Sequence, residues 1–267
     1  MTQRAASSAR RETALVTGAS RGIGLELARL LAQDGYDLVL VARSEDALKQ
    51  IARELEAAHA IQARALVQDL SRPEAPGTIL AALEASSTAV DVLVNNAGFG
   101  AHGPFREIDG ITARDMLQVN NAALTELTRR FLPGMLERGS GRILNVASLA
   151  AFMPGPVMAV YHASKAYVLR LSVALAEELR GSGVTVTVLC PGYVRTGFQD
   201  RAALDLGTVR IARLGVMDAA TVAQVGYRGM MRGKAVVVPG VVNKLLALGS
   251  KLGPRFLVTR IAHWLQA

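Results

Sequence analysis

A phenol and an ammonium group stand four residues apart in the segment YHASKAY, at Tyr161 and Lys165. On a helix, side chains at this spacing lie one turn apart on the same face. A nearby positive charge favours the ionised phenol; lowering its pKa from about 10 by ~3 needs about 4 kcal/mol. The pair therefore favours a tyrosine whose pKa is tuned by the lysine; a surface tyrosine and lysine on an amphipathic helix are the alternative.

The segment TGASRGIG, residues 17–24, places Gly18, Gly22 and Gly24 where an apolar run ends and a helical pattern begins. Glycines at such a turn let a pyrophosphate approach the helix N-terminus, where free N–H groups and the helix dipole favour an anion. The spacing differs from the G-x-G-x-x-G fingerprint, so a plain glycine-rich turn is the alternative. The position directly after the first predicted strand favours dinucleotide binding.

Two arginines indicate which dinucleotide binds. The second predicted strand, residues 37–42, is followed by Arg43 rather than by the acid that commonly holds the ribose 2′-hydroxyl of NAD. Asp37 begins that strand and lies too far back for this role. Arg21 projects from the glycine turn nearby, and two guanidinium groups can clamp one phosphate. The arrangement predicts NADP(H) in preference to NAD(H); two solvated surface arginines are the alternative.

Other polar residues fall where further predicted strands end. The sequence NNAG at 95–98 closes the fourth strand, and its Ala97 and Gly98 leave the backbone bare enough for a ring to lie against it. A simple asparagine turn is the alternative. Ser148 ends the fifth strand, and Asn120 lies in a helical stretch between the two. Because ligands of parallel sheets bind at the carboxyl ends of the strands, we expect these residues at a single site.

Apolar runs alternate with helical patterns along the chain, in the rhythm of βαβ units. Strands are predicted over residues 13–18, 37–42, 63–68, 91–96, 142–148, 184–190 and 235–239. Helices are predicted over residues 22–34, 45–58, 74–86, 112–131, 159–181 and 219–231. The central strands are almost wholly apolar, as parallel strands covered on both faces are. We therefore predict an α/β fold: one Rossmann-like domain with a doubly wound parallel sheet of about seven strands and helices on both faces.

Composition excludes several classes of function. Of 267 residues, 51% are hydrophobic, and the net charge of +8 lies at the ends, because residues 1–11 and 241–267 hold seven basic residues and no acid. The other 23 basic residues nearly balance the 22 acidic ones, and only 4% are aromatic, so no nucleic-acid surface is expected. The single cysteine, Cys190, is typical of a reducing compartment, so we expect a cytoplasmic protein. Four scattered histidines offer no metal-ligand spacing, and no metal is expected.

Taken together, TGASRGIG, NNAG, Asn120, Ser148, YHASK and the pair Pro191–Gly192 resemble the short-chain dehydrogenase/reductases in order and spacing, over about residues 13–196. The resemblance implies hydride transfer between a nicotinamide and a carbonyl or secondary alcohol, with Asn120, Ser148, Tyr161 and Lys165 as the catalytic set. In similar enzymes the serine polarises the carbonyl, the tyrosine delivers the proton, the lysine also holds the nicotinamide ribose, and the asparagine relays protons through water. The implied cofactor contacts are Gly18, Ser20, Arg21, Gly22, Ile23, Gly24, Arg43, Asp69, Leu70, Asn95, Ala97, Gly98, Tyr161, Lys165, Pro191, Gly192, Val194 and Thr196.

The end of the chain departs from this family pattern. Bacterial 3-oxoacyl carrier-protein reductases of the family usually end in a strand followed by V-D-G-G, part of a tetramer interface, and this chain lacks that sequence. We therefore expect a homodimer, with a tetramer as the alternative. Residues 1–11 are expected to form a flexible tail and 12–240 the catalytic domain, with a substrate lid at 197–217.

Residues 241–267 are predicted to be an amphipathic extension that packs on the domain or on a second subunit. Leu257, Ile261, Trp264 and Leu265 recur at helical spacing. Lys244, Lys251 and Arg255 are expected to share one face, by i, i+7, i+11 counting. Contact of this basic segment with an anionic membrane surface is the alternative.

The expected substrate is an apolar carbonyl compound such as a 3-oxoacyl thioester or a steroid-like ketone. Apolar side chains flank the catalytic residues in the sequence and suggest an apolar pocket: Phe152, Met153, Met158 and Phe198. Reduction of small aldehydes or sugars is one alternative. A binding protein that senses a dinucleotide without chemistry is another, although a pure sensor needs no proton donor.

Overall fold

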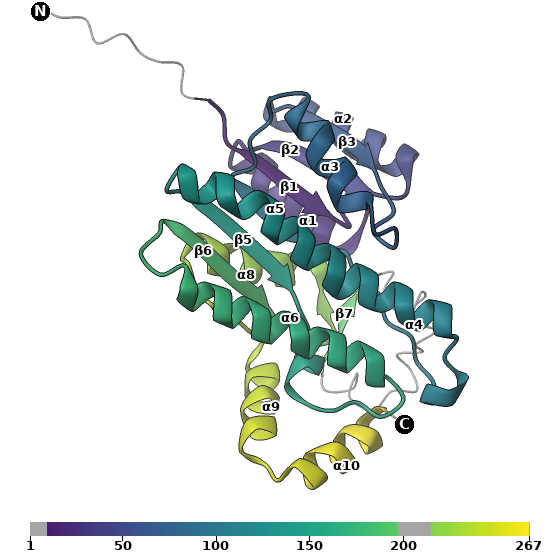
Figure 1. The fold of residues 1–267 in the computed structure, drawn as a ribbon. Coiled ribbons are helices and arrows are strands. Elements are labelled where there is room, and N and C mark those ends of the chain that lie inside the picture. The colour runs from purple at the N-terminus through teal and green to yellow at the C-terminus, as the bar shows by residue number, and fades with distance from the viewer. Residues whose placement is uncertain (1–9, 197–214, 267) are drawn as a thin grey trace, which may run out of the picture.

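The computed structural model describes residues 10–196 and 215–266, and they form a three-layer α/β structure (Figure 1). Seven parallel strands make the central sheet in the order β3-β2-β1-β4-β5-β6-β9. Their bounds are Thr13–Thr17 (β1), Asp37–Ala42 (β2), Ala63–Val67 (β3), Val92–Asn95 (β4), Gly141–Val146 (β5), Val184–Leu189 (β6) and Val236–Val237 (β9). The predicted fold class and all seven predicted strands are confirmed.

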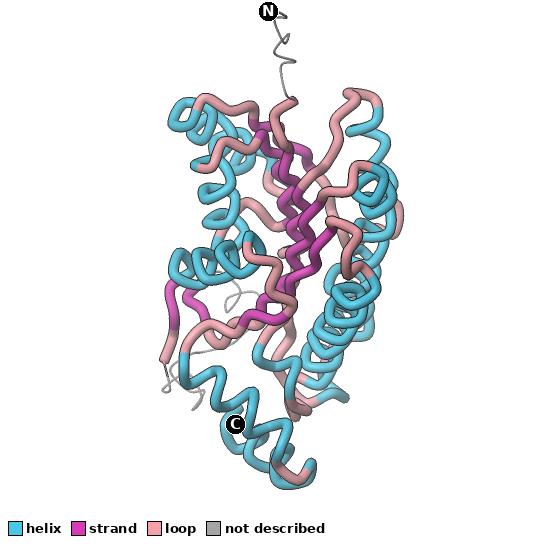
Figure 2. Tube along the Cα trace, turned by 90° about the vertical axis from the view of Figure 1, so that its left-hand side faces the viewer, coloured by secondary structure: helices cyan, strands magenta, loops and turns pink. Residues whose placement is uncertain are grey.

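Helices cover both faces of the sheet, which Figure 2 shows edge-on between two helical layers. One layer holds α1 (Gly22–Gln33), α2 (Glu45–His59) and α8 (Ala219–Met231). The other holds α3 (Ala75–Glu84), α4 (Gly110–Leu117), α5 (Leu124–Glu137) and α6 (Ala159–Glu178). Each layer has its own apolar core: Leu27 and Leu31 of α1 pack on β1, and Leu127 and Met135 of α5 pack on the opposite face. Such burial is worth about 1.5–3 kcal/mol for each large side chain.

The order of strands in the sheet runs outward in one direction from β1 and in the other from β4. The point between these two strands determines where a ligand can bind. β1 pairs with β2 on one side and β4 on the other, both in parallel register. The crossovers therefore leave the sheet in opposite directions and open a crevice beyond the carboxyl ends of the two strands. The carboxyl ends of β5 and β6 lie on the same side of the sheet, because both strands are parallel to β4.

The helical stretch around Asn120 differs from the prediction of one helix over 112–131. The Asp109 side chain accepts a hydrogen bond from Thr112 N–H (2.9 Å) and starts α4 earlier, at Gly110. A π-helical turn, η2 (Gln118–Ala123), joins α4 to α5, which continues through Pro133 to Glu137. A proline inside a helix removes a backbone hydrogen bond. Phe131 and Met135, on either side of Pro133, are buried in the core and hold the helix together.

Smaller elements also differ from the predictions. A second sheet pairs β7 (Val194–Arg195) with β8 (Met217–Asp218), and these two-residue strands are too short for a periodic signal. The expected tail of residues 1–11 is two residues too long, because Arg10 forms an ion pair with Asp91 (2.7 Å) and Arg11 one with Asp37 (3.3 Å). Residues 1–9 and most of the predicted lid, 197–214, lie outside the described residues.

The C-terminal extension forms two helices, α9 (Val241–Leu252) and α10 (Arg255–Gln266). Gly253 and Pro254 separate them, since Pro254 has no N–H with which to continue the first helix. The prediction that Lys244, Lys251 and Arg255 share one helical face is therefore wrong: Arg255 begins the second helix. Both helices lie together at the lower end of the molecule as drawn in Figures 1 and 2.

Candidate active site

A turn between β1 and α1 forms the floor of a cavity of about 520 Å³. Gly18 sits there with φ +66°, and its N–H donates to Val41 O (2.8 Å). A Cβ on Gly24 would lie 2.4 Å from Gly18 O, so a side chain has no room at this position. Arg21 precedes the helix without a side-chain cap, which leaves the first-turn N–H groups of α1 available to an anion. The turn has the shape that a pyrophosphate requires.

Asn96 holds this turn closed from the neighbouring strand. Its Nδ2 donates to Thr17 O (2.9 Å) and to Gly18 O (3.2 Å). The prediction had placed Asn95 against the cofactor, and this is wrong. The Asn95 side chain turns into the core, where Nδ2 donates to Asn145 Oδ1 (2.9 Å) and Thr128 Oγ1 (3.1 Å). Adjacent strand residues point to opposite faces, so only one of the two asparagines reaches the cavity.

The two predicted phosphate ligands, Arg21 and Arg43, both line the same cavity. Asp69 and Leu70, at the end of β3, lie on this side as well. Burial raises the pKa of Asp69, but hydrogen bonds from Ser71 and the charge of Arg43 outweigh it and lower that pKa overall. This end of the cavity therefore has two guanidinium groups, which suit a phosphate, together with the ionised carboxylate of Asp69.

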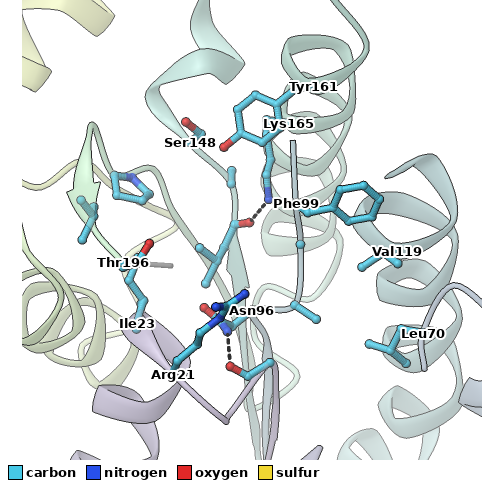
Figure 3. Close-up of a pocket in the computed structure, with 18 of the residues that line it drawn as sticks. Arg21, Ile23, Leu70, Asn96, Phe99, Val119, Ser148, Tyr161, Lys165 and Thr196 are labelled. Carbon is cyan, nitrogen blue, oxygen red and sulfur yellow. Dashed lines mark hydrogen bonds between the residues drawn. The ribbon is translucent and has the colours of Figure 1, made fainter. Parts of the chain in front are cut away.

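Ser148, Tyr161 and Lys165 meet at the opposite end of the cavity from Arg21 (Figure 3). Tyr161 and Lys165 project from the first turns of α6, and Ser148 follows β5. A hydrogen bond joins the Ser148 hydroxyl to the Tyr161 phenol. Lys165 Nζ donates to Val146 O (2.9 Å) and lies 5.8 Å from the centre of the Tyr161 ring. The expected trio is thus brought together.

The pKa of Tyr161 is raised to about 12, chiefly by burial, while its hydrogen bond with Ser148 acts in the opposite direction. Burial also lowers the pKa of Lys165 to about 8. The expected net lowering of the Tyr161 pKa is therefore not seen, because burial outweighs the favourable influences on the phenolate. Desolvation penalises both charged forms, and Lys165 directs its ammonium to a backbone carbonyl. The phenol is accordingly protonated at neutral pH, ready to donate.

Asn120 lies inside the π-helical turn, a feature that often marks functional sites. Its Oδ1 accepts from Phe99 N–H (3.1 Å), and its Nδ2 donates to Phe99 O (3.0 Å) and Ser164 Oγ (3.0 Å). Ser164 in turn donates to Tyr161 O (2.7 Å). Asn120 is buried behind the cavity wall, and it links that wall to the helix that carries Tyr161. Its role as a proton relay stays a prediction.

The segment after β6 closes the cavity on the side of α1. A Cβ on Gly22 (φ +59°) would lie 2.9 Å from the Thr196 side chain, so this segment packs directly against the glycine turn. Seventeen of the predicted cofactor and catalytic residues line the cavity, and Gly24, Asn95 and Asn120 do not. The seventeen are Gly18, Ser20, Arg21, Gly22, Ile23, Arg43, Asp69, Leu70, Ala97, Gly98, Ser148, Tyr161, Lys165, Pro191, Gly192, Val194 and Thr196.

Several lining residues were not predicted as site residues, among them Phe99, Val119, His162 and Tyr193. Tyr193 lies in the cavity wall, and burial raises its pKa to about 12. His162 also borders the cavity, and its Nδ1 lies 2.8 Å from Met153 O, so it anchors the loop beside the catalytic residues. Burial lowers the pKa of His162. The His162 side chain is buried on α6.

The fold and this cavity define a dinucleotide-binding oxidoreductase. A family model described as short chain dehydrogenase matches residues 12–206, and the chain belongs to this family. It is 39% identical over 183 residues to the ketoacyl reductase HetN of Nostoc sp., which covers 68% of this chain and 63% of that protein. It is 35% identical over 189 residues to the very-long-chain 3-oxoacyl-CoA reductase of Rattus norvegicus, covering 69% of this chain. The chain matches 60% of the length of that second relative.

Solved structures agree with this assignment. A short-chain dehydrogenase from Sphingobium yanoikuyae in complex with NADPH superposes with a TM-score of 0.81 at 32% identity, over 90% of this chain and 93% of that one. A short-chain dehydrogenase/reductase from Burkholderia phymatum in complex with NAD has a TM-score of 0.80 at 29% identity, over 89% and 92%. The family thus accommodates either dinucleotide on this fold.

Proposed function

We propose that this protein is an NADPH-dependent reductase of apolar carbonyl compounds, with a 3-oxoacyl thioester as the preferred substrate class. The observation that carries the proposal is the meeting of Ser148, Tyr161 and Lys165 at one end of a cavity whose other end holds Arg21 and Arg43. The names of the relatives, a ketoacyl reductase and a very-long-chain 3-oxoacyl-CoA reductase, support the substrate class.

The chain's own residues supply the proton and the polarisation. Bound NADPH would supply the hydride to the carbonyl carbon. The Ser148 hydroxyl donates a hydrogen bond to the carbonyl oxygen and stabilises its developing charge. The Tyr161 phenol gives its proton to the same oxygen, and the Lys165 ammonium stabilises the phenolate left behind until solvent reprotonates it. The reverse reaction, oxidation of a secondary alcohol, uses the same groups.

Apolar lining supports a large hydrophobic substrate. Leu149, Met153 and Met158 line the cavity on the side of Ser148, and Phe99 and Val119 face them. Of the other side chains expected there, Phe152 is not among the lining residues and Phe198 lies outside the described part. A dinucleotide sensor would have no use for the proton donor, and reduction of a small aldehyde or sugar is the alternative that the substrate panel tests.

The preference for NADPH rests on the two arginines. Arg21 and Arg43 reach the cavity from different elements, and at this point an NAD-selective site commonly has an acid. Matching solved structures include complexes with NADPH and with NAD, so the assignment depends on these residues of the chain itself.

We also propose a cytoplasmic homodimer. Leu117 on α4, with Tyr167 and Val173 on α6, are exposed apolar side chains on neighbouring helices of one layer. A second copy would cover them, and sedimentation velocity of Val173→Glu should then show a monomer. Within the described residues no helix is both long and apolar enough to cross a bilayer.

The test of the reductase proposal is NADPH oxidation by the full chain against a panel of carbonyl compounds. The panel contains 3-oxoacyl-CoA esters of increasing chain length, a steroid ketone, a short aldehyde and a keto sugar. We expect kcat/KM to rise with acyl chain length and Tyr161→Phe to lose at least about a hundredfold in kcat. Equal rates for the variant and the wild type would refute the mechanism, and a preference for the sugar would refute the substrate class.

A further inference from the structure

Helix α9 exposes a continuous apolar stripe. Val241, Leu245, Leu248 and Leu252 follow one another at i, i+4, i+7 and i+11, so they share one face of the helix. Each of the four is between 53% and 78% exposed. Contiguous apolar patches of this kind on a folded surface mark interaction sites.

The opposite face of α9 fixes the helix to the catalytic domain. Ala247 is buried there, and Asn243 Nδ2 donates to Pro239 O (2.8 Å). A Cβ on Gly192, in the cavity wall, would lie 2.5 Å from Asn243 Oδ1. α9 also packs against η3 (Leu149–Phe152), the turn that follows Ser148. The exposed stripe is therefore held rigidly beside the catalytic end of the cavity.

Helix α10 also exposes apolar side chains on one side and buries a residue on the other. Phe256, Leu257, Ile261 and Trp264 are between 44% and 66% exposed, while Ala262 on the other side is buried. Trp264 is the single tryptophan of the chain. Aromatic side chains with one polar edge are typical of the boundary between water and a lipid bilayer.

The positive charge of residues 241–267 indicates what kind of partner binds the exposed faces of α9 and α10. Residues 241–267 contain four lysines or arginines and no acidic residue, and Lys244 and Arg260 are exposed beside the apolar side chains. A second copy that met this surface through a two-fold axis would bring an identical cationic segment against it. Like charges across an interface are unfavourable, whereas an anionic lipid surface complements both the charge and the apolar stripe.

We propose that α9 and α10 form a docking surface for a bilayer that contains anionic phospholipids. The apolar stripe enters the boundary between headgroups and acyl chains, and the flanking cations contact the lipid phosphates. Resting on the proposed function, this geometry also gives the site a source of substrate. α9 packs on η3, next to Ser148, so the docked surface lies beside the catalytic end of the cavity, and we expect a long acyl chain to pass from the bilayer to Ser148 and Tyr161.

The test is binding of the full chain to vesicles of phosphatidylcholine containing about one third phosphatidylserine. Trp264 reports the contact directly, because its emission shifts to shorter wavelength when it leaves water and is quenched by brominated acyl chains. We expect both effects with the mixed vesicles, and weaker binding to pure phosphatidylcholine. No shift and no co-sedimentation with the anionic vesicles would overturn the proposal.

Variants distinguish vesicle binding through α9 and α10 from nonspecific binding through any exposed apolar side chain. The pair Leu245→Glu and Leu248→Glu should reduce partitioning at least about a hundredfold, because two apolar groups are replaced by charges. Ile111→Glu is the control, since Ile111 is an equally exposed apolar residue on α4, and it should leave partitioning within about twofold. The pair Lys244→Gln and Arg260→Gln should cost about fivefold for each cation removed. Equal losses for the control and the stripe variant would overturn the proposal.

Other occupants of the surface give different results. If the stripe joins two copies, the Leu245→Glu and Leu248→Glu pair dissociates a dimer in sedimentation velocity and vesicles bind neither form; this overturns the proposal. If an acidic carrier protein docks there, that purified protein, and not vesicles, shifts the Trp264 emission; this also overturns it. Vesicle binding needs no catalysis, so a chain that binds lipid but reduces no 3-oxoacyl ester supports this surface and refutes the reductase proposal alone.

Discussion

Replacing Lys165 by methionine should make the protein more stable and less active. Lys165 is 4% exposed, and burial lowers its pKa from the usual 10.5 to about 8. At pH 7 that difference corresponds to about 3 kcal/mol of destabilisation of the folded state. Methionine removes this cost but leaves Val146 O without its ammonium donor, which costs about 1–3 kcal/mol. We expect a net gain of about 1 kcal/mol in the free energy of unfolding, with reductase activity reduced at least about a hundredfold.

The pH dependence of this difference tests its cause. Because the pKa of Lys165 is lower in the folded state, the unfolded chain holds more protons between about pH 8 and 10.5. The burial cost is complete below pH 8 and declines as pH rises through this range. The stability difference between Lys165→Met and the wild type, measured by urea unfolding, should therefore fall by about 2 kcal/mol between pH 7 and 9.5. The variant, more stable by about 1 kcal/mol at pH 7, becomes less stable by about 1 kcal/mol at pH 9.5.

The control for this measurement is Lys234→Met, at an exposed lysine, which should change stability by less than about 0.5 kcal/mol at both pH values. Other groups titrate equally in wild type and variant, so they cancel in the comparison. A Lys165→Met advantage that stays constant from pH 7 to 9.5 would refute the assignment of a burial cost to this ammonium.

Three further substitutions test the cofactor site and the fold. Arg43→Asp should raise the Kd for NADPH at least about tenfold more than the Kd for NADH, measured by fluorescence titration, because it places a carboxylate beside the 2′-phosphate; equal effects would contradict the clamp. Gly24→Ala should lower the free energy of unfolding by about 1–3 kcal/mol and raise the Kd for NADPH at least about tenfold, because its Cβ would lie 2.3 Å from Asn96 Nδ2. A variant that binds NADPH with the wild-type Kd would contradict this close packing. Asp91→Asn should lower the free energy of unfolding by about 1–3 kcal/mol, because the buried carboxylate accepts hydrogen bonds from Arg10 (2.7 Å) and Thr13 N–H (2.8 Å); an unchanged urea midpoint would contradict it.

Most of the fold could be predicted from the sequence because its central strands are covered on both faces. Such strands are continuous apolar runs, and glycine turns and helical periodicity mark the segments between them. Features decided by tertiary packing could not be predicted. The continuation of α5 through Pro133 and the pairing of β7 with β8 depend on contacts between distant segments. The break between α9 and α10 could have been predicted, because Gly253 and Pro254 are residues that end helices. The prediction that Lys244, Lys251 and Arg255 share a face assumed one continuous helix and overlooked this pair.

The candidate site was predictable where chemistry needs a residue type at a fixed spacing. The glycine turn and the pair Tyr161 and Lys165 are local motifs, and the structure brings both to one cavity. The choice between Asn95 and Asn96 depends on which residue ends β4 facing the core, and a sequence does not show this register. The direction of the pKa shift of Tyr161 depends on burial from several elements, which no spacing along α6 reveals.

Transfer of deuterium tests the central claim most directly. Full-length protein is mixed with NADPH that carries deuterium at both hydrogen positions of nicotinamide C4 and with a long-chain 3-oxoacyl-CoA, and the product is analysed by mass spectrometry in a single turnover. We predict one deuterium at C3 of a 3-hydroxyacyl product for the wild type, and a rate at least about a hundredfold lower for Tyr161→Phe. A product without deuterium, or equal rates for both proteins, would contradict hydride reduction with Tyr161 as the proton donor.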